Sequence, residues 1–111
     1  MKLLVFILNK EEHLEEILEA FFELNIKGAT ILDSVGMGSI VARDIPIFAG
    51  FKSLLQGSRP ANKTILTVIP ENLVEPAVKA IEQIVGSLEE PGNGLLFVLK
   101  IDQVYGLSKT F

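Results

Sequence analysis

The sequence predicts an α+β domain of the ferredoxin-like type, a βαββαβ sandwich with a four-stranded antiparallel sheet and two helices on one face. Two observations lead to this fold class. The order strand, helix, strand occurs twice, before and after a long irregular loop that follows the second strand. The two helical segments each carry one apolar stripe, whereas the strands are apolar on both faces. The length, 111 residues, suits a single domain spanning residues 1–111.

The first unit opens with KLLVFIL, residues 2–8, a β-prone apolar run typical of a central strand. Residues 9–28 follow, with leucine, isoleucine and phenylalanine at helical spacing and glutamates mostly on the other side. Asn9 with Glu12 three residues later fits a capping box, and Gly28 suits the helix exit. The pattern therefore predicts an amphipathic helix after the first strand.

A second strand, ATILDSV at residues 29–35, ends at the glycine pair Gly36 and Gly38. Residues 39–62 are less regular, since prolines and glycines interrupt them. A connection this long in a small domain is usually functional or mobile. We therefore expect a long functional loop at about residues 39–62.

The second unit repeats the order. KTILTVI, residues 63–69, is the third strand, and residues 71–88 have apolar positions at helical spacing. Pro76 is compatible with this helix if it lies in the first turn, where only one hydrogen bond is lost. EEPGNG, residues 89–94, is a turn before the fourth strand at residues 95–101. If the helices cover one face of this sheet, the other apolar face needs a cover, and other copies of the chain are the simplest one.

Composition limits the class of function. Apolar residues make up 49% of the chain and the net charge is −4, which argues against a general nucleic-acid binder. No cysteine is present, so thiol chemistry is excluded. The longest early apolar run, residues 3–8, is far below the roughly 20 residues of a membrane span. We expect a cytoplasmic protein that is not embedded in a membrane.

No arrangement typical of an enzyme is visible. The one histidine, His13, lies among glutamates, and its pairing with Glu16 one turn away is a weak metal signal. No serine lies in a nucleophile-elbow motif. The sequence predicts no catalytic residues and no metal site, although the fold class alone does not exclude an enzyme.

Two glycine-rich turns are the candidate binding elements. Residues 36–39, GMGS, close the second strand, and residues 91–94, PGNG, precede the fourth. Either is a plain turn or a nest of backbone amides that binds an anion. Five of the ten basic residues lie near the long loop or the C-terminus: Arg43, Lys52, Arg59, Lys63 and Lys109.

These segments resemble the PII signalling family over nearly the whole chain except the middle loop. The first part of the likeness is the opening strand, helix and strand with the glycine pair. The segment TILTVIPENLVEPAVKAIEQIV is similar to the family's strand, proline and second helix. The segment PGNGLLFVLKIDQV is similar to the family's Gly-Asp-Gly turn and final strand. The resemblance implies a homotrimer with the sheets packed in its centre. It also implies adenine-nucleotide or related effectors in clefts between subunits, and a T-loop, here about residues 39–62, that signals to a membrane transporter or an enzyme.

Carried over position by position, the resemblance implies ligand contacts from three segments and one loop arginine. These residues are Gly28, Ala29, Thr30, Gly36, Met37, Gly38, Ser39, Arg59, Gly92, Asn93 and Gly94.

The chain also departs from the nitrogen-regulatory pattern. Ser39 and Ile40 stand where those proteins have Arg-Gln, and Leu95 stands where they have a lysine. The family's two arginines after the last strand have no clear counterpart. Each lost charge-assisted hydrogen bond weakens phosphate binding by roughly 1.5–3 kcal/mol. Loop cations such as Arg59 replace the lost charges, or the ligand carries less charge, or no nucleotide binds.

The predicted function is therefore a non-catalytic PII-like regulator. It binds a small effector, an adenine nucleotide or a relative, and signals through residues 39–62. The alternative is a metal-responsive or purely structural PII-like trimer that binds no nucleotide.

Overall fold

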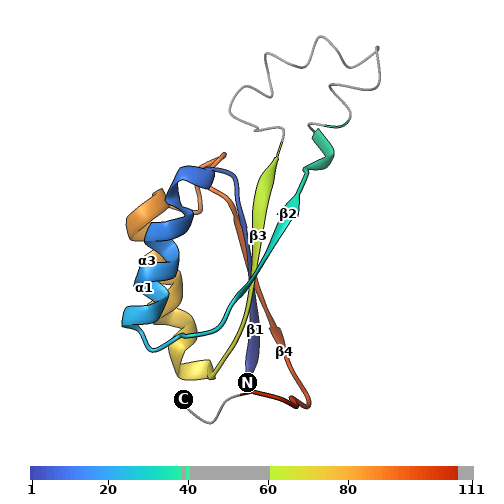
Figure 1. The fold of residues 1–111 in the computed structure, drawn as a ribbon. Helices are drawn as coiled ribbons and strands as arrows, with labels where there is room; N and C mark the ends of the chain where they lie inside the picture. The colour runs from blue at the N-terminus through green and yellow to red at the C-terminus, as the bar shows by residue number, and fades with distance from the viewer. Residues whose placement is uncertain (39, 41–60, 108–111) are drawn as a thin grey trace.

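The fold is the predicted one. The computed structural model describes residues 1–38, 40 and 61–107. Four strands form one antiparallel sheet in the order β2-β3-β1-β4, and both helices pack on one side of it (Figure 1). The elements are β1 (Lys2–Leu8), η1 (Glu11–His13), α1 (Leu14–Glu23), β2 (Thr30–Ser34), β3 (Asn62–Ile69), η3 (Glu71–Leu73), α3 (Val74–Val85) and β4 (Leu95–Lys100).

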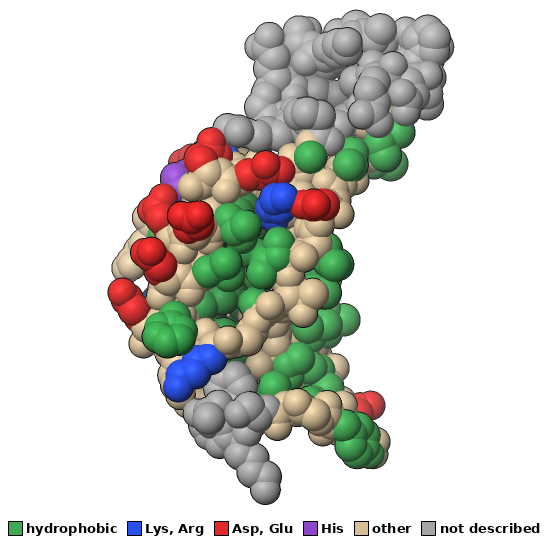
Figure 2. Space-filling view, in the orientation of Figure 1, with side chains coloured by type: hydrophobic (Ala, Val, Ile, Leu, Met, Phe, Trp, Pro, Cys, Tyr) green, Lys and Arg blue, Asp and Glu red, His purple; other side chains and the backbone are tan. Residues whose placement is uncertain are grey.

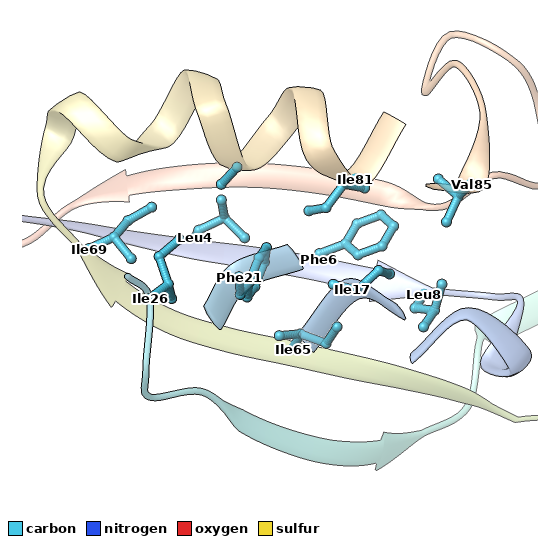
Figure 3. Packing of buried hydrophobic residues seen from close by; sticks show 11 residues of the cluster. Leu4, Phe6, Leu8, Ile17, Phe21, Ile26, Ile65, Ile69, Ile81 and Val85 are labelled. Carbon is cyan, nitrogen blue, oxygen red and sulfur yellow. The ribbon is translucent and has the colours of Figure 1, made fainter. Parts of the chain in front are cut away.

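The hydrophobic core lies between the sheet and the helices (Figure 3). Alternate residues of β1 point to opposite faces, so Leu4, Phe6 and Leu8 face the helices and are completely buried. They meet apolar side chains of the amphipathic helices, among them Phe21 of α1 and Ile81 of α3. The stripes that the sequence shows at helical spacing are thus the faces that close this core.

The start of the first helix differs from the expectation. The segment begins with the 3-10 turn η1, Lys10 rather than Asn9 occupies the N-cap position, and the Lys10 side chain makes no capping hydrogen bond. The capping box expected at Asn9 is therefore wrong. Pro76, by contrast, is the third residue of α3 and lies in its first turn, as predicted. There its missing N–H interrupts little of the helix.

Helix α1 ends earlier than Gly28, in a Schellman motif at Asn25. Asn25 has φ of 68°, and the N–H of Ile26 donates to the carbonyl of Phe21 at 2.8 Å. The N–H of Asn25 donates to the carbonyl of Phe22 at 3.0 Å. Ile26 and Phe21 are both buried, so this motif brings the chain back onto the core before β2.

The sheet face away from the helices is apolar as well, and we call it the open face. Its apolar members are Leu3, Val5, Ile7, Leu32, Leu66, Val68, Leu95, Phe97 and Leu99, which alternate with the core-facing residues and lie opposite one another in register. Figure 2 shows hydrophobic side chains along this side of the molecule. Leu95, Phe97 and Leu99 are 58%, 42% and 46% exposed. The apolar character expected for both faces is confirmed.

Candidate functional site

The three segments that the sequence singled out lie at three different places on the sheet. Residues 36–38 follow the end of β2, and residues 92–94 precede β4, at the same end of the sheet but at its opposite edges. Two strands lie between β2 and β4, so the two edges are about 14 Å apart at the usual strand spacing. Residues 28–30 lie at the other end of β2. One copy of the chain therefore does not gather them into one pocket.

The first glycine segment begins a helical turn. Met37 and Gly38 are helical, and the N–H of Ile40 donates to the carbonyl of Gly36 at 3.4 Å. Among the described residues, the atom nearest to a Cβ at Gly36 would be Asn62 Nδ2, at 3.9 Å, so these residues leave room for a Cβ there. Met37 is 79% exposed. Two other predicted site residues, Ser39 and Arg59, lie outside the described residues.

The second glycine turn is tied to the fold through Asn93, whose side chain is buried. Asn93 Nδ2 donates to the carbonyl of Ser87 at 2.7 Å, and Asn93 Oδ1 accepts from Lys10 Nζ at 3.0 Å. Gly94 approaches Phe6 so closely that a Cβ there would lie 2.6 Å from Cε1 of the ring. The side chain of Asn93 thus orders the turn, and the contact with Lys10 is one that sequence reasoning missed, because 83 residues separate the two.

The third segment borders a groove of about 260 Å³ beside α1. The lining comprises Leu18, Phe21, Phe22, Ile26, Lys27, Gly28, Ala29 and Ile31. The carbonyl of Gly28 is held by Thr67 Oγ1 at 2.6 Å. Thr30 is exposed, and its register partner Leu66 places it on the open face. Small-molecule sites usually measure roughly 300–1,000 Å³, so this groove alone is on the small side.

Polar contacts join β2 and β3 where the long loop leaves the sheet. Ser34 Oγ contacts Thr64 Oγ1 at 2.7 Å and also Asn62 Oδ1, and these residues share the open face. On the helix face Lys63 pairs with Asp33, its register partner. The hydrogen bond to Asp33 is the main cause that raises the pKa of Lys63 above its usual 10.5.

A model of the family described as "Nitrogen regulatory protein P-II" matches residues 1–110. The chain belongs to the P-II family. A comparison with curated proteins gives no match. P-II proteins are regulatory rather than catalytic, typically form trimers, and bind effectors and partners.

For this P-II chain, the structure adds three observations on a metal site and on a membrane-spanning helix. His13 Nδ1 lies 3.0 Å from Glu16 Oε1, as a helical pair of this spacing allows. Among the described residues, no group of three or more histidine, aspartate or glutamate side chains could hold a metal ion. Across the same part of the chain, no helix is both long and apolar enough to cross a membrane.

The replacement of the family's lysine by Leu95 changes the surface beside the second glycine turn. Leu95 lies opposite Ile7 in the register and is largely exposed on the open face. An apolar side chain there extends the open face up to the glycine turn 92–94. It supplies no charge beside that turn, whereas Lys10 does.

Proposed function

We propose that this P-II protein is a non-catalytic regulator that assembles as a homotrimer through the open face. It binds a small anionic effector, an adenine nucleotide or a relative, between subunits, and it signals to a protein target through residues 39–62. The observation that carries the proposal is the arrangement of the glycine segments on a sheet with one uncovered apolar face.

The open face supports assembly on physical grounds. Leu95, Phe97 and Leu99 lie side by side along an edge strand and remain 42–58% exposed in the single chain. Monomeric soluble proteins rarely expose contiguous apolar surface of this kind. Burying it releases about 25 cal/mol per Å² of apolar area. Packing the open faces of several copies against one another covers it without any other partner.

The separation of the glycine segments supports a cleft between subunits. Segment 36–38 and turn 92–94 lie at opposite edges of one sheet, about 14 Å apart, so one small effector contacts both only if they come from different copies. The groove beside Gly28 and Ala29 is likewise smaller than a usual small-molecule site, so a complete pocket there needs residues beyond those that line it.

The effector class follows from the residues at the shared end of the sheet. Glycine backbone permits close approach of a ligand, and backbone N–H groups with a nearby lysine favour an anion. An adenine nucleotide or a relative combines such an anion with a flat apolar group. Because Ser39 and Leu95 stand where the nitrogen-regulatory proteins have an arginine and a lysine, we expect weaker triphosphate binding than the nitrogen-regulatory pattern implies.

The first test is a thermal-shift screen of the purified protein, followed by calorimetry. ATP, ADP, AMP, cyclic AMP, cyclic di-AMP, S-adenosylmethionine, 2-oxoglutarate and divalent metals are tested, since binding to the native state raises the melting temperature. A nucleotide hit supports the proposal, and Gly36→Ala should then weaken binding with little change in the unliganded melting temperature, because the described residues leave room for a Cβ there. A response to metals alone would favour the metal-responsive alternative, and no response would refute effector binding.

A further inference from the structure

Helix α1 carries a shallow hollow of about 390 Å³ on its solvent-facing side, which we call the α1 hollow. The residues that line it are Leu18, Glu19, Phe22 and Glu23. Leu18 is half-buried, and the other three are exposed. Phe22 is 64% exposed, whereas its neighbour Phe21 is 1% exposed and belongs to the core. The ring of Phe22 is therefore an apolar surface that the core does not use.

Negative charge surrounds this ring. Glu15, Glu19 and Glu23 recur at four-residue spacing, so they form one row along α1. The helix contains no lysine or arginine, and the ion pairs among the described residues include none of these three glutamates. Lys27 lines the adjacent groove beside Phe22 without pairing with any of them. Figure 2 shows acidic side chains along this side of the molecule.

The glutamate row does not serve the stability of its own helix. Like charges four residues apart on a helix repel one another. Glu23 is the last residue of α1, where the helix dipole disfavours a negative charge. Glu15, in the first turn, is placed favourably by the same dipole. An occupant that brings positive charge to Glu19 and Glu23 would relieve both the repulsion and the unfavourable dipole contact.

The lining of the α1 hollow distinguishes between cations. A guanidinium group is planar, stacks on an aromatic ring, and binds a carboxylate through two parallel hydrogen bonds. The aliphatic part of an arginine side chain also covers apolar surface such as that of Leu18. A lysine ammonium group is a point charge that lacks the planar stacking and the paired bonds. A metal ion is not favoured, because the described residues contain no group of three or more metal-ligating side chains.

We propose that the α1 hollow docks an arginine side chain from a basic segment of a protein partner. The guanidinium group stacks on Phe22 and pairs with Glu19 or Glu23, and further cations of the same segment face the rest of the glutamate row. This contact goes beyond the proposed function, in which residues 39–62 face the target. The helices lie on one side of the sheet, so assembly through the open face on its other side leaves α1 uncovered (Figure 1).

The experiment is an NMR titration of the full-length protein with an amidated tetra-arginine peptide at low ionic strength. An amidated tetralysine peptide of the same charge is the comparison probe. The double variant Glu19→Gln/Glu23→Gln removes the carboxylates of the hollow, and Phe22→Leu removes the ring. The matched control Glu75→Gln/Glu89→Gln removes two exposed carboxylates elsewhere on the chain, with the same change in net charge.

We expect the tetra-arginine peptide to shift the amide signals of residues 18–23 and to bind the wild type more tightly than tetralysine does. Glu19→Gln/Glu23→Gln should weaken tetra-arginine binding about tenfold or more, because charge-assisted hydrogen bonds are lost. Glu75→Gln/Glu89→Gln should change the affinity little. Phe22→Leu should bring the affinities of the two peptides together, since only arginine gains from the ring.

Three results would overturn the proposal. Equal losses of affinity in the two double variants, or shifts spread over all exposed glutamates, would show a general attraction between a basic peptide and an acidic protein. Equal binding of tetra-arginine and tetralysine by the wild type would refute the arginine assignment. A lower molar mass of Phe22→Glu in light scattering would show that a second copy of the chain, and not another protein, covers the α1 hollow.

Discussion

The close approach of Gly94 to Phe6 makes a quantitative prediction about stability. A Cβ at Gly94 would lie 2.6 Å from Phe6 Cε1 and 2.8 Å from the carbonyl oxygen of Ile7, at a φ of +117°. Gly92 has a similar φ of +88°, but no atom of the described residues lies within 4 Å of a Cβ there. The left-handed backbone costs a non-glycine residue about 1–2 kcal/mol, and forcing atoms into a packed core costs about 1–3 kcal/mol more.

We therefore expect Gly92→Ala to lower the free energy of unfolding by about 1–2 kcal/mol, and Gly94→Ala by about 2–5 kcal/mol. Urea unfolding at one fixed protein concentration measures both, and the difference between the two variants isolates the steric clash. Phe6→Leu in the Gly94→Ala background should cost less than it does alone, since it relieves the clash. Equal losses in the two glycine variants, or additive losses in the double variant, would refute the packing argument. The same packing makes Gly36, rather than Gly94, the position at which to test ligand binding.

Three further predictions concern the open face and two polar contacts. Phe97→Glu places a charge on the open face and should therefore lower the molar mass measured by light scattering. The control Phe22→Glu, on the exposed side of α1, should leave the mass unchanged. An unchanged mass in both variants would contradict assembly through the open face. Thr67→Val should destabilise the fold by about 1 kcal/mol, because the hydrogen bond from Thr67 Oγ1 to the carbonyl of Gly28 is lost. Thr67→Ser keeps the hydroxyl group and should keep most of the stability, and chemical denaturation measures both variants. The pKa of Lys63 is raised, so its pairing with Asp33 persists through neutral pH and is lost only as the pH rises above the usual 10.5. Asp33→Asn should lower the pKa of Lys63 in an NMR titration, and an unchanged pKa would contradict the pairing.

Most of the fold could be predicted from the sequence because hydrophobic periodicity is a local signal. Alternate burial in β1 and the apolar stripes of α1 and α3 follow directly from residue spacing. Helix ends were harder to predict, because capping depends on backbone geometry. The sequence favoured Asn9 as the N-cap and Gly28 as the helix exit, whereas the structure has Lys10 at the N-cap of a 3-10 turn and the left-handed residue at Asn25.

The sequence predicted which segments form the candidate site, but not the side-chain contacts that position them. Glycine spacing and the resemblance indicated residues 28–30, 36–39 and 92–94, but no local pattern reveals that Lys10, just after β1, reaches Asn93, just before the neighbouring strand β4. The same limit applies to the role of Asn93, which reads as a turn residue in the sequence and is buried in the structure. Long-range contacts of single polar side chains leave no periodic signal, so only the three-dimensional arrangement shows them.

The uncovered apolar sheet face has a consequence for how stability is measured. If copies associate through it, the native state gains free energy by mass action, and the unfolding midpoint depends on protein concentration. Dilution would then lower the melting temperature even though no contact within the chain changes. In a cell, the amount of this protein would set its resistance to unfolding as well as its signalling capacity, and a subunit that lacks partners would be the form most exposed to aggregation and degradation.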